Sequence, residues 1–237
     1  MIAGTKGYAE EAEELVKRYE SIPFAKKHQA VLHLIPSAPC SVLDIGAGTG
    51  ADAAWFAGLG HRVVAVEPTD ELRLPGMALH PSALIAWVND SLPHLVMTLK
   101  RGQQFDVVMI TAVWMHLDEL ERQQAMPKVA SLIRRGGVLI MSLRHGPSAP
   151  RRRMFEVSAE ETIHLAQAHG LRSILSVRTQ SAQPVNRQAG VTWSRLAFAC
   201  VLGAPDDERG RMPPNSSIER TSSGKRRLPP AAAHAEH

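Results

Sequence analysis

Three glycines and two acidic residues form the part of the sequence with the clearest chemistry. Gly46, Gly48 and Gly50 follow a short apolar segment, and Asp44 precedes the first of them. Glycine takes positive φ angles and lets a ligand approach the backbone, and a helix that starts after it offers unpaired N–H groups. Glu67 comes about 20 residues later, where the second strand of a βαβ unit places an acid near ribose hydroxyls. The spacing predicts a pocket for an adenosine-containing ligand.

Two classes of cofactor fit this spacing, and Asp44 separates them. Gly46, Gly48 and Ala51 also satisfy the dinucleotide fingerprint, so an NAD(P)-dependent oxidoreductase is an alternative. A carboxylate beside the first glycine would repel a pyrophosphate if poorly screened. S-adenosylmethionine has no phosphate, and a carboxylate stabilises its sulfonium and α-ammonium groups. Asp44 therefore favours a methyl donor over a hydride carrier.

Five segments together resemble the motifs of class I S-adenosylmethionine-dependent methyltransferases. In the family's order they are residues 42–50, 63–67, 89–93, 105–110 and 136–142. The resemblance covers about residues 35–201. It implies an α/β fold with a doubly wound, seven-stranded, mostly parallel, Rossmann-like sheet, whose last strand is antiparallel between the fifth and sixth. It also implies S-adenosyl-L-methionine as the cofactor.

The resemblance implies which residues bind this cofactor. Asp90 would accept a hydrogen bond from the adenine amino group, with a neighbouring backbone N–H against the ring; the alternative is an exposed acid in a turn. The expected cofactor-binding residues are Asp44, Gly46, Ala47, Gly48, Gly50, Glu67, Pro68, Asn89, Asp90, Ser91 and Thr111.

Residues after the fourth and fifth strands are expected to face the methyl acceptor. Trp114 and Met115 would supply apolar walls beside the reacting sulfur, because a drier site favours the dispersed charge of the transition state. His116 and His145 are candidate general bases, since histidine accepts a proton near neutral pH; either could instead be a structural hydrogen-bonding group. Arg144 could bind a carboxylate or phosphate of an anionic acceptor.

The elements that must position these residues alternate along the chain, which predicts a mostly parallel sheet covered on both faces by helices. Strands are expected near residues 41–45, 62–66, 83–87, 104–110, 137–143, 171–178 and 191–201. Asp118 with Glu121, and Ser158 with Glu161, predict capping boxes at two helix starts.

Two prolines lie where connecting helices are expected. The Leu-Pro-Gly sequence at residues 74–76 predicts a short or displaced second connecting helix. Pro127 is expected to break or kink the helix that starts near Asp118.

The chain divides into three predicted parts: an N-terminal helical lid (1–34), the cofactor-binding domain (35–202) and a disordered tail (203–237). Apolar residues at helical spacing predict an amphipathic helix around Leu15, and a second helical run is expected over residues 24–34. Tyr19, Phe24 and His28 could contact the acceptor from this lid or simply dock the helices on the sheet. The tail shows no periodic apolar pattern.

Composition limits the function further. The 237 residues, 44% of them hydrophobic, suit one globular domain, and two cysteines suit reduced thiols in a cytoplasmic protein. We find no export signal and no apolar stretch of about 18 residues, so no membrane location is expected. The net charge of +4 is small and local, so nucleic acid is not expected as a partner. A non-catalytic module that senses cofactor or binds nucleic acid is an alternative.

Several methyltransferase subclasses lack their residues here. There is no Asn/Asp-Pro-Pro-aromatic tetrapeptide for exocyclic amines, and no cysteine nucleophile is suitably placed after the fourth strand for pyrimidine C5 chemistry. No carboxylate cluster suits a catechol-type magnesium site, so no metal is expected. By elimination, the predicted substrate is a small molecule methylated on oxygen or nitrogen, and the predicted protein is a monomer or homodimer.

Overall fold

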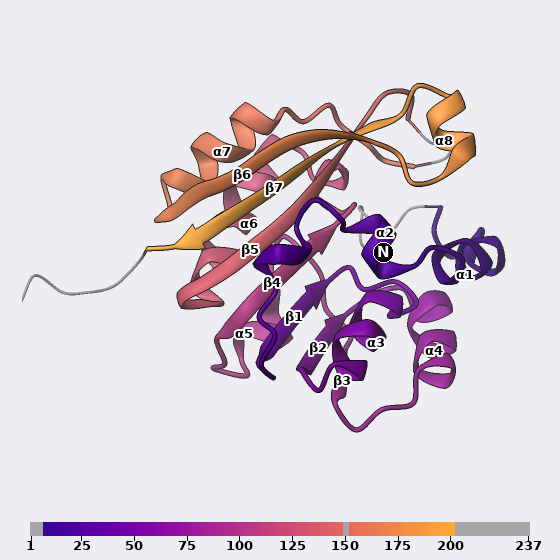
Figure 1. Ribbon diagram of the computed structural model, residues 1–237, viewed down its shortest axis with the longest axis horizontal. Helices are drawn as coiled ribbons and strands as arrows, with labels where there is room; N and C mark the ends of the chain where they lie inside the picture. The colour runs from indigo at the N-terminus through magenta and orange to yellow at the C-terminus, as the bar shows by residue number, and fades with distance from the viewer. Residues whose placement is uncertain (1–6, 149–151, 202–237) are drawn as a thin grey trace, which may run out of the picture. The chain divides into compact units, whose positions relative to one another are not determined.

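Seven strands form one sheet in the computed structural model, which describes residues 7–148 and 152–201 (Figure 1). They are β1 (Ser41–Ile45), β2 (Arg62–Val66), β3 (Ile85–Val88), β4 (Phe105–Thr111), β5 (Ile133–His145), β6 (Leu171–Gln180) and β7 (Thr192–Cys200). Their order is β3-β2-β1-β4-β5-β7-β6. Strands β1 to β5 pair in parallel, and β7 runs antiparallel to β5 and β6. The predicted fold class and the position of the last strand are confirmed.

Helices connect these strands and precede the first of them. They are α1 (Ala12–Glu20), α2 (Phe24–Lys27), α3 (Ala51–Gly58), α4 (Asp70–Leu79), α5 (Val96–Leu99), α6 (Glu119–Ser131), α7 (Ala159–Gln167) and α8 (Pro184–Gln188), with the 3-10 turns η2 (Leu32–Leu34) and η3 (Trp114–His116). The predicted single helical run over 24–34 is therefore wrong: it consists of α2 and η2, two short elements.

Side chains of successive strand residues point to opposite faces, and each face has its own core. On one face, Leu43 and Ile45 of β1 pack with buried residues of α6. On the other face, Val42 packs with Phe56 of α3 and with Phe24 of α2. Figure 1 shows α3 beside the β1–β3 half of the sheet and α7 beside β6. Helices on both faces leave the carboxyl ends of the strands free for a ligand.

The two internal prolines do not interrupt their helices. The short or displaced helix expected around Pro75 is therefore wrong, and the break expected at Pro127 does not occur. Helix α4 runs through Pro75, and α6 runs through Pro127. Leu72 is buried, and Gly76 packs against the backbone of Thr49. Tertiary packing of this kind outweighs the intrinsic helix propensity of single residues, which is weak.

The two predicted capping boxes differ. At α6 the box is complete, because Asp118 Oδ1 accepts from the Glu121 N–H at 2.9 Å and Glu121 Oε2 accepts from the Asp118 N–H at 2.8 Å. At α7 only the Ser158 half is formed, because the Glu161 carboxylate binds Arg122 instead. The predicted start of each helix is correct.

Strand β5 is longer than the predicted 137–143. It begins at Ile133 and continues through Gly136, whose φ is 77°, while the β4–β5 register shifts between Phe105 and Val107. Residues 133–136 extend it at the end away from the glycine turn, and Arg144 and His145, expected to follow the strand, are its last two residues. The predicted tail, 203–237, falls outside the described residues. None of the helices in the described ranges has the length and apolar character needed to cross a bilayer.

Candidate functional site

A cavity of about 280 Å³ lies at the carboxyl ends of the central strands. Its walls come from the glycine turn after β1, from the residues that follow β2 to β5, and from the segments around α1 and α8. Most of the predicted site residues meet there: Asp44, Gly46, Ala47, Gly48, Glu67, Pro68, Asp90, Ser91, Thr111, Tyr19, Met115, His116 and Arg144. Ligands of open α/β sheets bind at this edge.

The glycine turn is fixed to β2. The N–H groups of Gly46 and Ala47 donate to the Val66 carbonyl at 2.8 and 2.9 Å. Glu67 Oε2 accepts from the Gly48 N–H and Oε1 from the Thr69 N–H, each at 2.8 Å. Burial raises the pKa of Glu67, although both N–H donors act to lower it. The carboxylate is therefore held at the lip of the turn, where the sequence places a ribose partner.

Asp44 is a buried carboxyl group with a free oxygen. Its Oδ2 has no hydrogen-bond partner among the described residues. Burial, followed by the charge of Asp52, raises the pKa of Asp44 to about 8. A group in this state gains from a cation brought into the cavity, because a positive charge restores the ionised form.

Asp90 forms the edge of the cavity after β3. Its carboxylate accepts from the Ser91 N–H at 2.9 Å, and from the Thr98 N–H and hydroxyl at 2.7 and 2.9 Å. These donors fix its orientation toward the cavity wall. Contact with an adenine amino group remains a prediction for this residue.

His116 faces the other end of the cavity in a defined tautomer. Its Nδ1 lies 2.6 Å from the Arg153 carbonyl oxygen, which can only accept, so Nδ1 carries the hydrogen. Nε2 then accepts from the Tyr8 hydroxyl at 2.8 Å. Burial lowers the pKa of His116, and burial raises that of Tyr8. The imidazole is thus neutral near pH 7 and available as a proton acceptor.

Arginine side chains line the same end. The Arg152 guanidinium carbon lies 3.7 Å from the centre of the Tyr8 ring, and its Nη2 lies 2.6 Å from Glu11. Arg144 also lines the cavity and donates to the Pro147 carbonyl. Arg153 instead binds Asp118 and Glu121 at the start of α6. Arg152 and Arg153 belong to an arginine run at residues 151–153, of which residue 151 lies outside the described residues.

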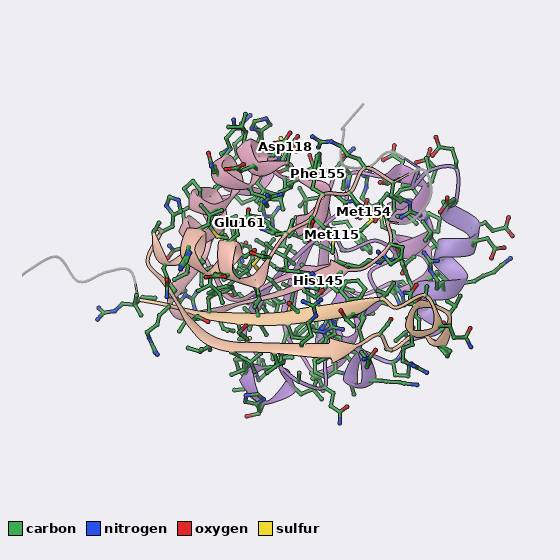
Figure 2. All side chains as sticks on the ribbon, turned by 90° about the horizontal axis from the view of Figure 1, so that it is seen from above. Met115, Asp118, His145, Met154, Phe155 and Glu161 are labelled. Carbon is green, nitrogen blue, oxygen red and sulfur yellow. The ribbon has the colours of Figure 1, made fainter. Side chains whose placement is uncertain are left out.

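Two methionines form an apolar wall of the cavity. Met115 and Met154 both line it, and both are labelled in Figure 2. The Phe155 N–H donates to the Met115 carbonyl at 2.8 Å, which ties the segment after β5 to the segment after β4. Met115 was predicted for this wall and Met154 was not.

Three predicted acceptor residues lie outside the cavity. Phe24 stacks on Trp55 with ring centres 3.8 Å apart, so it docks α2 on α3. Trp114 is fully buried in the core that contains α6. His145 Nε2 lies 2.8 Å from Ser194 Oγ on the neighbouring strand and does not line the cavity (Figure 2). Apolar packing and sheet hydrogen bonds, rather than ligand contacts, account for these positions.

Two predicted cofactor residues are also displaced from the cavity wall. The side chain of Asn89 is exposed to solvent. Gly50 supports the turn from behind, because a Cβ there would lie 2.5 Å from the Trp87 ring. Their neighbours Asp90 and Gly48 form the wall instead.

Several lining residues were not predicted from the sequence. They are Tyr8, Lys27, Asp52, Gln183, Asn186 and Arg195. Each comes from a segment far along the chain from the glycine turn or lies inside an ordinary helix or strand, so only the fold brings them together. Asp52 in the first turn of α3 is the exception, because its closeness to Gly50 in the sequence could have indicated that it lines the cavity.

The described fold is similar to that of known proteins. Residues 43–141 match the family model described as a methyltransferase domain. No curated protein matches the chain at a significant level. Among solved structures, the 1,6-didemethyltoxoflavin-N1-methyltransferase of Burkholderia thailandensis, with bound 1,6-didemethyltoxoflavin and S-adenosylhomocysteine, is 21% identical; the match covers 81% of this chain and 84% of that one, with a TM-score of 0.63.

Two further structures share the fold. The N-methyltransferase NodS of Bradyrhizobium japonicum WM9, in complex with S-adenosylhomocysteine, is 15% identical over 77% of this chain and 85% of that one, with a TM-score of 0.54. The magnesium protoporphyrin IX methyltransferase of Synechocystis PCC 6803, with bound S-adenosylmethionine, is 15% identical over 81% and 80%, with a TM-score of 0.55. Residues 43–141 therefore match a methyltransferase domain, and the fold is shared with solved methyltransferases that bind S-adenosylmethionine or S-adenosylhomocysteine.

Proposed function

We propose that this protein transfers a methyl group from S-adenosylmethionine to an oxygen or nitrogen atom of a small, anionic acceptor. The observation that supports it best is one cavity with two chemically distinct ends. Asp44 and Glu67 lie at the glycine turn, while His116, Arg144 and Arg152 belong to the other end. The first end suits a cationic adenosyl compound, and the second suits a negatively charged molecule that must lose a proton.

The residues at the glycine turn fit the proposed cofactor. Asp44 supplies an unpartnered carboxyl oxygen for a positive charge, and Glu67 and Pro68 form the wall where a ribose would lie. Asp90 and Ser91 continue this wall toward the adenine. The bound cofactor supplies the methyl group for an in-line displacement. The protein's task is to align the acceptor and exclude water, which contributes several kcal/mol.

His116 is the proposed general base. Its Nε2 already accepts a hydrogen bond from Tyr8, and both side chains line the cavity. The acceptor's proton would move to the Tyr8 oxygen while the Tyr8 proton moves to Nε2, which leaves tyrosine neutral and His116 as imidazolium. The Nδ1–H remains bonded to the Arg153 carbonyl and stabilises that cation. His145 is not supported in this role, because it lies outside the cavity.

Arg144 and Arg152 are the proposed contacts for a carboxylate or phosphate of the acceptor. Guanidinium groups bind such anions through two parallel hydrogen bonds. Two of the solved neighbours are named as N-methyltransferases, one of them with a small heterocyclic molecule bound, which supports a small acceptor with a nucleophilic nitrogen or oxygen.

The first test is calorimetric titration of the purified protein with S-adenosylhomocysteine and, in parallel, NADH. We expect micromolar binding of the first and none of the second. Binding of the dinucleotide alone would overturn the proposal in favour of an oxidoreductase.

The acceptor is tested separately with a panel of small carboxylic acids and phosphates, each paired with its neutral analogue, in a methyl-transfer assay. We expect turnover of anionic members, with Arg144→Ala raising KM by about tenfold or more, as loss of a charge-assisted hydrogen bond predicts. A preference for neutral analogues that is unaffected by Arg144→Ala would contradict the anionic acceptor.

A further inference from the structure

We propose that Arg195 on β7 binds the α-carboxylate of the cofactor, so that it and Asp44 recognise opposite charges of the cofactor's amino-acid end. This inference rests on the proposed function and adds a residue to the same cavity. Arg195 is the fourth residue of β7, a strand that is otherwise mostly apolar.

Arg195 is a buried cation that has no ion-pair partner among the described residues. Its side chain is only 7% exposed and lines the cavity. Within residues 7–148 and 152–201 it forms no side-chain hydrogen bond or ion pair, and its guanidinium carbon lies 5.4 Å from the Trp193 ring centre. Burial lowers the pKa of Arg195 to about 10, so the group still carries its charge at neutral pH. A buried charge with no counter-ion is costly, and an anionic ligand removes that cost.

The nearby carboxylate of Asp52 is already occupied. Lys27 Nζ lies 2.6 Å from its Oδ1, and His28 Nε2 lies 2.9 Å from its Oδ2. Burial lowers the pKa of His28, so the imidazole is neutral and donates to Asp52. Lys27 and Asp52 therefore cancel one another, and Asp44, with a pKa of about 8, is largely protonated at pH 7. Among the described residues, Arg195 forms an ion pair with none of these groups.

The position of Arg195 favours the cofactor over the acceptor as the source of the carboxylate. It pairs across the sheet with Ser142 of β5, another cavity residue. The charge of Asp52, in the first turn after the glycine turn, acts on the pKa of Arg195. Arg144 pairs with Trp193, two residues before Arg195 on β7, and Arg152 covers the ring of Tyr8. Arg195 is the lining arginine whose pKa the charge of Asp52 raises, and Asp52 also acts on Asp44.

The test compares two ligands that differ in the amino-acid group alone. S-adenosylhomocysteine carries the α-carboxylate, and 5′-methylthioadenosine lacks the whole amino-acid end. Calorimetry measures both ligands with the wild type, Arg195→Gln, Arg195→Lys and the control Arg172→Gln, an exposed residue of the neighbouring strand. Circular dichroism and thermal melting establish that each variant is folded.

We expect Arg195→Gln to weaken the binding of S-adenosylhomocysteine by about 10- to 100-fold, which is the range for a lost hydrogen bond to a charged group. The affinity for 5′-methylthioadenosine should stay within about twofold of the wild-type value. Arg195→Lys keeps the charge and should recover part of the affinity for S-adenosylhomocysteine. Arg172→Gln should change the affinity for neither ligand. Equal weakening of both ligands, or unchanged binding of S-adenosylhomocysteine, would overturn the inference while the proposed function stands. A wild type that binds neither ligand would overturn the proposed function itself.

Discussion

Asp44 illustrates at the scale of one residue how a binding site can conflict with stability. The carboxyl group is fully buried beside Asp52 and Glu67, and one of its oxygens has no partner among the described residues. In the unfolded chain the same group ionises near pH 4. The folded protein therefore holds a proton on Asp44 over a pH range in which the unfolded chain does not.

The sign of the effect on stability follows from this difference. Between about pH 4 and pH 8 the folded state binds more protons at Asp44 than the unfolded state, so the free energy of unfolding falls as the pH rises through this window. Asp44→Asn removes the titration and keeps the shape. We expect it to raise Tm by about 5 °C at pH 8, and by less at pH 5, as a gain of one to two kcal/mol implies. Thermal melts across this pH range measure the difference from wild type.

Asp70→Asn is the matched control, because the Asp70 side chain is 58% exposed and lies at the solvent side of α4. Its effect on Tm should not vary between pH 5 and pH 8. Asp44→Asn should also weaken the binding of S-adenosylhomocysteine by about tenfold or more, since function and stability oppose each other at this position. A Tm difference that does not grow with pH would show that Asp44 ionises normally in the folded protein.

Residues of the site differ in how far the sequence could reveal them. Asp44 and Glu67 stand at fixed positions around a glycine turn, and a local motif identifies them. Tyr8 and Arg195 reach the same cavity from opposite ends of the described chain. Nothing in their local sequence indicates this, because their roles depend on how β7 and the N-terminal segment pack against the sheet.

At the scale of elements, hydrophobic periodicity predicted where the strands lie, and proline misled the prediction of helices. Seven apolar segments became seven strands, because burying them requires pairing in one sheet. Pro75 and Pro127 lie inside continuous helices, and buried residues such as Leu72 and Met126 pack those helices against the rest of the fold. Local sequence carries the propensity of a residue but not the strength of its tertiary contacts.

Helix α4 supplies a prediction that separates propensity from packing. Alanine is a better helix former than glycine by about 1 kcal/mol, so propensity alone favours Gly76→Ala. A Cβ on Gly76 would, however, lie 2.5 Å from the Thr49 carbonyl oxygen in the glycine turn and 2.9 Å from the Trp87 ring. We expect Gly76→Ala to lower the free energy of unfolding by about 1–3 kcal/mol, as overpacking does, and to weaken cofactor binding.

Gly58→Ala provides the comparison, because it lies in helix α3 and a Cβ there would meet nothing within 4 Å. This variant should be neutral or more stable by up to about 1 kcal/mol. Urea unfolding measures both changes, and titration with S-adenosylhomocysteine measures affinity. If Gly76→Ala proved as stable as Gly58→Ala, the contact between α4 and the glycine turn would have no energetic role.

At the scale of the whole molecule, the sheet forms the floor of the cavity and segments distant in sequence form its cover. The N-terminal turn contributes Tyr8, and the segment after β5 contributes Arg152, which stacks on that ring. Glu11 joins the two segments through its ion pair with Arg152. If these segments cover a bound ligand, we expect their contact to govern the rate of release more than the stability of the fold.

Glu11→Gln tests the cover as a unit. The ion pair is partly exposed, with Glu11 36% and Arg152 5% accessible, and such pairs contribute about 0–1 kcal/mol to folding. We therefore expect Tm to change little, while the dissociation rate of S-adenosylhomocysteine in stopped-flow displacement rises roughly three- to tenfold, because opening becomes easier by about 1 kcal/mol. Glu13→Gln, which removes an ion pair with Lys17 at the protein surface, should leave that rate unchanged.

Salt should accelerate release of the ligand from the wild type more than from Glu11→Gln, since screening weakens the ion pair that the variant already lacks. Equal dissociation rates in the wild type and Glu11→Gln would mean that the two segments do not act together as a cover.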